Sequence, residues 1–196
     1  MKVPSKIAEI VESSSAEFTA QCYKLEQAPP LGCLVKVGKK PVEIYGVVYN
    51  IKTHSLEPGR RVVARGEKMQ TEDEIFRTNP QLAKLLRTDF NVLVVGYSQG
   101  GSLYQHLPQR PPPIHGFVYI CTEEEVRMFT DCLDFLGLLI DTRLPVPAEE
   151  ITAACLRYVS QAHHDRQAFL VRAGKELAYL LGGDTKRLSS LLKRLK

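Results

Sequence analysis

The stretch Asn91-Val92-Leu93-Val94-Val95-Gly96-Tyr97-Ser98-Gln99-Gly100-Gly101 is a short apolar run that ends in Gly-x-Ser-x-Gly. Two folds are compatible with it. In one, the run is a buried strand, the serine sits in a strained turn and a helix follows, which is how α/β-hydrolases present a nucleophile. In the other, the two final glycines close a β-hairpin, because glycine readily adopts the positive φ angles of tight turns.

Residues 102–113 favour the hairpin. Leucine or glutamine at positions 103, 105 and 107 alternates with ring side chains at 104 and 106, which is the period of a strand. Pro108 and the three prolines at 111–113 limit any helix here to about two turns. We therefore expect a hairpin from Val92 to Pro108, with Ser98 and Gln99 at its tip.

A serine esterase that uses the elbow Gly96-Tyr97-Ser98-Gln99-Gly100 remains an alternative. Its triad would need an acid and then a histidine, which a chain of this size offers by chance. No glycine-rich oxyanion loop precedes the serine, and parallel strands are not evident before residue 90. The acid and base candidates are Asp131, Asp134, Asp141, His163 and His164.

The composition is that of a globular protein in water. The chain has 196 residues, of which 44% are hydrophobic and 24% charged, and this length suffices for a buried core. No apolar run approaches the roughly eighteen residues of a membrane span, and residues 1–7 lack the apolar centre of a signal peptide. We therefore expect a cytoplasmic protein without a transmembrane segment.

Cysteine and histidine patterns predict neither a metal site nor a cofactor. The five cysteines are scattered without a C-x-x-C pair, so we expect small buried apolar residues. His163-His164 beside Asp165 could coordinate a metal, but adjacent residues near a helix junction are more often solvated. The cysteines are Cys22, Cys33, Cys121, Cys132 and Cys155.

The net charge of +4 is located at the C-terminus. Residues 184–196 contain five bases and one acid, which equals the net charge of the whole chain. This segment also carries leucines at 188, 191, 192 and 195, the spacing of a single apolar stripe on a helix. The sequence therefore predicts a basic amphipathic helix at the end of the chain.

Residues 5–121 read mostly as strands and turns. Short β-rich runs are separated by Ser13-Ser14-Ser15, by residues 29–32 and by residues 38–41. Several short strands at regular spacing predict a small closed β-barrel of about six strands. One helix, about 71–87, is inserted among them, and Asn79-Pro80 breaks it into two pieces.

After Cys121 the apolar period changes from 2 to 3.6 residues. Thr122 followed by three glutamates predicts a capped helix start, and one helix then carries apolar residues from Val126 to Ile140. Three more helices are expected, around 151–159, after Asp165 and from Asp184. The predicted fold class is α+β, with a barrel domain at 1–121 followed by an α-helical domain at 122–196.

The barrel region resembles the HAS-barrel, the N-terminal barrel of HerA-type DNA translocases and of the rotary ATP synthase catalytic subunits. The pattern is a first strand, a serine-rich turn, a second strand, a Gly-x-Leu-Val strand and a Tyr-Gly-x-Val strand. The segments that carry it are Ile7–Phe18, Pro30–Val37, Ile44–Ile51 and Leu56–Arg61.

This resemblance implies a stand-alone bacterial HAS-barrel protein with a helical C-terminal extension. In the family, the barrel helps ATPase subunits to assemble into rings, while a separate domain hydrolyses ATP. This chain has no Gly-x-x-x-x-Gly-Lys-Ser/Thr loop, and Gly182-Gly183-Asp184-Thr185-Lys186 only approximates one. We therefore expect no ATPase activity.

Two basic segments are candidate binding surfaces. The terminal helix suits an acidic partner, a nucleic acid or an anionic membrane face, unless its leucines cover the helical domain while its bases stay solvated. The loop 57–66 has three arginines near two glycines, which could clamp phosphate, but acids at 57, 67 and 72–74 offer competing ion pairs. The candidate residues are Arg60, Arg61, Arg65, Lys186, Arg187, Lys193, Arg194 and Lys196.

These features predict a non-catalytic adaptor that binds another protein, in association with an ATPase or a membrane-associated complex. The alternative from another class is an accessory factor that binds nucleic acid, and the serine esterase ranks third. The sequence does not identify the partner.

Overall fold

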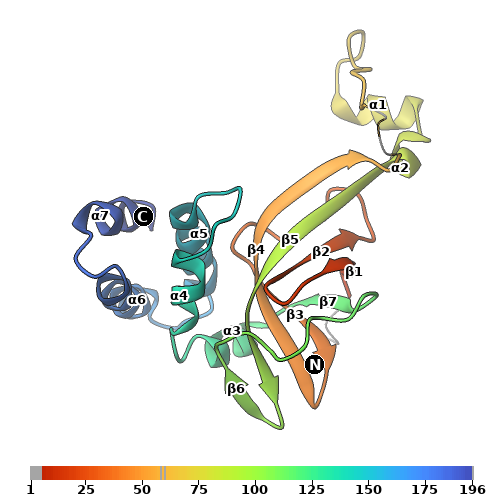
Figure 1. Ribbon diagram of the computed structural model, residues 1–196. Helices are drawn as coiled ribbons and strands as arrows, with labels where there is room; N and C mark the ends of the chain where they lie inside the picture. Colours follow the sequence, from red (N-terminus) through yellow and green to blue (C-terminus); the bar gives the residue numbers. More distant parts are fainter. Residues whose placement is uncertain (1–5, 58, 60, 196) are drawn as a thin grey trace.

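Six antiparallel strands close into a barrel in the computed structural model, which describes residues 6–57, 59 and 61–195 (Figure 1). Around the barrel the order is β2-β1-β7-β3-β4-β5, and β5 pairs with β2 to complete the circle. The predicted α+β fold with a closed barrel of about six strands is confirmed. The strands are β1 (Ala8–Ser13), β2 (Glu17–Cys22), β3 (Leu34–Lys39), β4 (Val42–Ser55), β5 (Leu86–Gln99) and β7 (Phe117–Ile120).

The central strands β4 and β5 are buried on both faces. On β5, Val92 and Val94 point into the barrel, whereas Leu93 and Val95 join the cluster formed with the C-terminal helices. This arrangement explains the unbroken apolar run at 92–95, because a strand covered on both faces needs no polar alternation. The barrel and the helices therefore share the same central strands.

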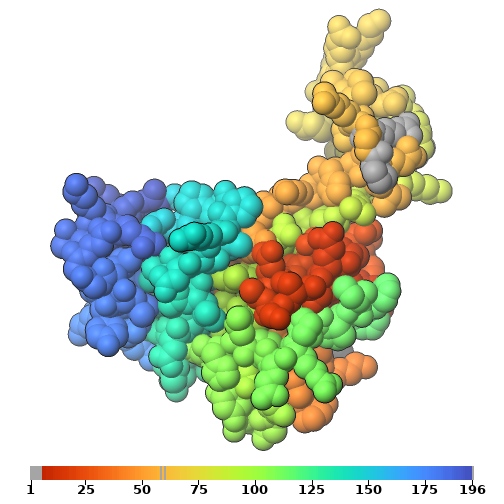
Figure 2. All heavy atoms as spheres, viewed as in Figure 1, coloured from red at the N-terminus to blue at the C-terminus, as the bar shows by residue number. Residues whose placement is uncertain are grey.

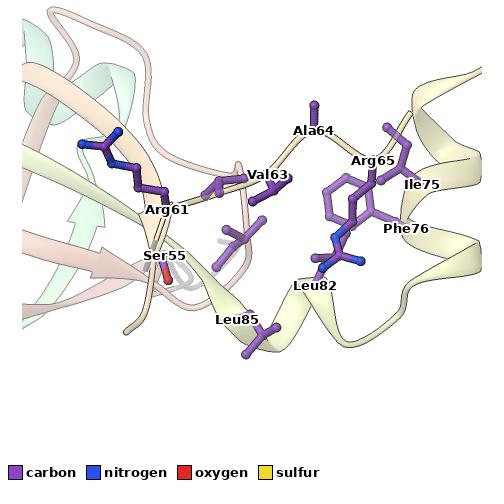
Figure 3. A pocket seen from close by; sticks show the side chains of 11 residues that line it. Ser55, Arg61, Val63, Ala64, Arg65, Ile75, Phe76, Leu82 and Leu85 are labelled. Atoms are coloured by element: carbon purple, nitrogen blue, oxygen red, sulfur yellow. The ribbon is translucent and has the colours of Figure 1, made fainter. Parts of the chain in front are cut away.

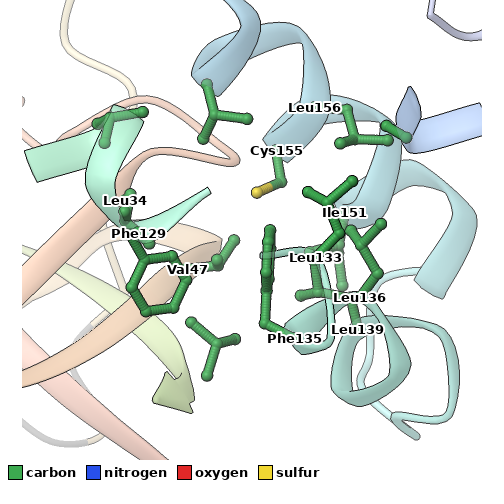
Figure 4. Close-up of a cluster of buried hydrophobic side chains, with 14 of the residues drawn as sticks. Leu34, Val47, Phe129, Leu133, Phe135, Leu136, Leu139, Ile151, Cys155 and Leu156 are labelled. Carbon is green, nitrogen blue, oxygen red and sulfur yellow. The ribbon is translucent and has the colours of Figure 1, made fainter. Parts of the chain in front are cut away.

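A layer of helices covers one outer side of the barrel. Barrel residues Leu34 and Val47 pack against Phe135, Ile151 and Cys155 of this layer (Figure 4). α5 also contacts α4, α6 and α7, so it lies at the centre of the layer. The helices are α3 (Glu123–Phe129), α4 (Phe135–Ile140), α5 (Ala148–Ser160), α6 (Arg166–Leu180) and α7 (Thr185–Lys193).

An ion pair between Lys36 and Glu125 attaches the layer to the barrel. The predicted cap at the start of α3 is present, because Thr122 and Glu125 form a capping box. Lys36 of β3 forms ion pairs with Glu125 at 2.5 Å and with Glu43 of β4 at 2.8 Å. Burial raises the pKa of Glu125, but the hydrogen bond from Lys36 and the cap outweigh it, so this pKa is lowered overall.

The prediction of one helix from Val126 to Ile140 is wrong. α3 ends at Phe129 and α4 begins at Phe135. The side-chain amide of Gln105 occupies the gap: Nε2 donates to the carbonyl oxygens of Phe129 (2.5 Å) and Cys132 (3.0 Å), and Oε1 accepts from the Phe135 amide (3.0 Å). These bonds satisfy backbone groups that a helix end leaves unpaired.

A two-stranded ribbon extends beyond the barrel. β4 and β5 pair from Val42 with Gln99 to Ser55 with Leu86. β3 covers β4 only as far as Val47, and β2 covers β5 only from Leu93 to Asp89. The last three pairs, from Thr53 to Ser55 on β4, therefore have no third strand, and we call this part of the ribbon the arm.

The arm carries residues 56–85, which we call the tip and which stand apart from the barrel and the helical layer (Figures 1 and 2). The tip contains α1 (Glu72–Thr78) and α2 (Leu82–Leu85), so the predicted inserted helix and its break at Asn79-Pro80 are confirmed. α2 ends two residues earlier than predicted, because Leu86 and Arg87 pair with β4.

We predict that Gln105→Ala destabilises the fold by about 1–3 kcal/mol, because it leaves two carbonyl groups and one amide without their partner. Urea unfolding followed by circular dichroism measures this loss, with the exposed Gln109→Ala as control. Equal unfolding midpoints for the two variants would show that the helix break does not depend on Gln105.

We also predict that Gly32→Ala destabilises the fold by about 2–4 kcal/mol. Gly32 has φ +81°, and a Cβ there would lie 2.3 Å from the backbone carbon of Ala154 in α5. Gly101→Ala is the matched control, because Gly101 has φ +89° with open space around it. A loss no larger than that of the control would exclude close docking of the 30–33 loop on α5.

Candidate interaction site at the tip of the arm

The tip has no core of its own. Among its described residues, 56–57, 59 and 61–85, none is buried. Val62 and Val63 are 61% and 70% exposed, and Leu56 and Phe76 are exposed as well. A cluster of exposed large apolar side chains of this kind is typical of a protein interaction site.

These side chains surround a cavity of about 290 Å³. The extended segment 61–65 forms one wall, and α1 contributes Ile75 and Phe76, which lie beside Arg65 (Figure 3). The described residues that line the cavity are Ser55, Arg61, Val62, Val63, Ala64, Arg65, Ile75, Phe76, Leu82, Leu85 and Leu86. The lining is therefore mostly apolar, with two guanidinium groups as its only charged side chains.

Asn79 holds the two walls together. Its Nδ2 donates to the carbonyl of Ile75 at the end of α1, and its Oδ1 accepts a long hydrogen bond of 3.5 Å from Arg65. Pro80 follows and prevents α1 from continuing. Glu74 accepts a hydrogen bond from the backbone of Gln70, which fixes the loop before α1.

Of the three loop arginines predicted as an anion site, Arg61 and Arg65 line the cavity, while Arg60 lies outside the described residues. No ion pair between described residues involves Arg61 or Arg65. The competing pairs with Glu67, Asp73 and their neighbours are therefore not formed in the part of the tip that the structure describes.

Two basic residues of the terminal helix form ion pairs with α5, and two others are exposed to solvent. Arg187 forms an ion pair with Glu149 of α5 at 2.6 Å, and Arg194 pairs with Glu150 of the same helix. Lys186 and Lys193 are exposed, and Lys196 lies outside the described residues. The row of leucines on this helix faces the helical layer. Leu191 is buried and Leu188 and Leu195 pack against the core, although Leu192 is exposed.

Ser98 lies within β5, where it pairs with Glu43 on β4 and with Leu103 on β6 (Ser102–Tyr104). Gly100 and Gly101, with φ +61° and +89°, form the turn between the strands. The predicted hairpin is confirmed, although β6 ends at Tyr104, well before Pro108, and Ser98 and Gln99 belong to the strand. The serine therefore does not occupy a strand-to-helix elbow.

His163, the first residue of the histidine pair, has structural partners. His163 bonds to the hydroxyl of Thr130 at 2.8 Å and stacks on Phe169, and burial lowers its pKa. Asp165 caps α6 by accepting from the Ala168 amide. Across the described ranges, no group of three histidine, cysteine or acidic side chains is placed to hold a metal ion.

Four of the five cysteines are buried as predicted. Cys132 is exposed because it lies in the break between α3 and α4, so the prediction is wrong for this residue. In the described part of the chain, no helix is both long and apolar enough to cross a membrane.

Comparison with known proteins gives no assignment: no protein family model and no curated protein sequence matches the chain.

We predict that Glu149→Gln destabilises the protein by about 0.5–1 kcal/mol at neutral pH. The hydrogen bond from Arg187 lowers the pKa of Glu149 below its ordinary value of 4.5, so the native state favours the carboxylate. This contribution is complete above the unfolded-state pKa and disappears as the pH falls through the folded-state value.

Unfolding free energies measured across the acid range test the direction of this pH dependence, with Glu176→Gln on α6 as control. The difference between wild type and Glu149→Gln should shrink towards low pH. A difference that grows on acidification would contradict the assignment.

Proposed function

We propose that this chain is a non-catalytic assembly adaptor that makes its protein contact through the tip of the arm. The observation that carries the proposal is that the described tip residues include no buried side chain, although they present large apolar groups around a cavity. Burial of such groups is the main favourable term in protein association, so a partner that covers them would stabilise the tip.

Polar contacts across the arm support this role. At its base, Asp89 forms an ion pair with Arg87 at 3.1 Å, and its carboxylate lies 3.0 Å from Nε2 of His54. The hydroxyls of Thr53 and Thr88 bond across the ribbon at 2.8 Å. A site on a fixed element loses less freedom on binding than a site on a flexible loop, and this improves affinity.

The resemblance of the barrel to the HAS-barrel suggests an ATPase or a membrane-associated complex as the setting for this adaptor. The nucleic-acid alternative has less support, because Arg187 and Arg194 of the basic segment already pair with acids of α5. The esterase alternative also has less support, because Ser98 lies in a paired strand.

Photo-crosslinking in the native host tests the proposal. With p-benzoylphenylalanine in place of Val63, we expect an adduct between this chain and a specific protein. Adding Phe76→Asp should reduce its yield by at least about tenfold, because a charge would then enter the apolar contact. Mass spectrometry of the adduct identifies the partner.

The same probe in place of Tyr179 is the matched control, because this α6 residue is 81% exposed and lies outside the tip. An adduct from Tyr179 together with none from Val63 would place the protein contact on the helical layer and contradict the proposal.

A further inference from the structure

The tip carries unpaired charges of both signs. Arg61 and Arg65 lie on the extended segment, and Glu72 and Asp73 begin α1. Among the described residues, none of these four side chains forms an ion pair. Residues 56–85 contain six bases and five acids, so the tip as a whole is nearly neutral.

The charges lie on different elements of the tip. Arg61 and Arg65 line the cavity from the extended segment, whereas Glu72 and Asp73 lie in the first turn of α1, whose last turn also carries Arg77. A purely acidic partner, or a nucleic acid, would pair with the arginines but would bring like charge towards Glu72 and Asp73. A partner that places acidic groups opposite the arginines and basic groups opposite the two carboxylates would pair with both sets of charges.

A second copy of the same surface has that arrangement. In a two-fold contact the same patch is used twice, so residue i meets residue j and j meets i. We propose that the tip binds the tip of a second copy of this chain, with Arg61 and Arg65 of each copy facing Glu72 and Asp73 of the other. This inference rests on the proposed function, because it names the partner at the same site.

The shape of the molecule permits such a contact. The tip projects from the barrel at the end of the arm, so two tips can meet without contact between the barrels or the helical layers (Figures 1 and 2). Val62, Val63 and Phe76 would form the apolar centre, and the charged groups would form the rim. The result is a dimer with a barrel at each end.

Charge-reversal variants of the full-length chain test the proposal by sedimentation velocity from about 1 to 100 µM, a range that covers moderate affinities. We expect wild type to form dimers. The double variants Arg61→Glu/Arg65→Glu and Glu72→Arg/Asp73→Arg should each dissociate at least about tenfold more readily, because every ion pair becomes a repulsion.

Mixing the two double variants should restore dimers, because each then offers the charges that the other needs. Since the described tip residues are unburied, the variants should keep the wild-type circular dichroism and unfolding midpoint. A monomeric wild type over the whole range would overturn the proposal, as would a dimer that both double variants leave intact.

The test separates this inference from the proposed function. A monomeric chain whose Val63 probe still crosslinks to a different protein would refute the two-fold contact and leave the adaptor proposal standing. The absence of any adduct from Val63 would instead count against the adaptor proposal itself.

Discussion

The burial of β4 and β5 on both faces is the constraint on which the rest of the structure depends. Inside the barrel, Val92 and Val94 belong to one core, while Leu93 and Val95 on the outer face belong to the core beneath the helices. The same two strands continue outward as the arm. The closed barrel, the docking of the helical layer and the position of the tip therefore follow from one pair of long strands.

This arrangement explains how the protein can carry the tip, which has no hydrophobic core of its own, away from the barrel. A two-stranded ribbon alone is marginally stable in water, but here most of its length is anchored in the barrel. The Asp89 contacts with His54 and Arg87 strengthen the base of the arm, although Asp89 Oδ1 itself is buried without a hydrogen bond. The stability of the protein thus resides in the barrel and helical layer, and the tip is available for contacts with other molecules.

Local signals predicted much of this fold. The glycine pair at 100–101 indicated the hairpin, Thr122 indicated the start of α3, and Asn79-Pro80 indicated the break in the inserted helix. The break between α3 and α4 was not predictable, because it depends on Gln105, which lies 24 residues from Phe129 in the sequence. The loop arginines were found from charge alone, but the apolar cavity was missed, because it forms only when residues 61–65 lie across α1.

Native-state amide hydrogen exchange tests the central claim, that the helical layer and the barrel depend on one shared pair of strands. We predict that the buried amides of α5 and those of Val92–Val95 exchange with the same free energy of opening, that of global unfolding. Exchange of the α5 amides at a much lower free energy, while the strand amides stay protected, would show that the helical layer opens independently of the barrel and would contradict this claim.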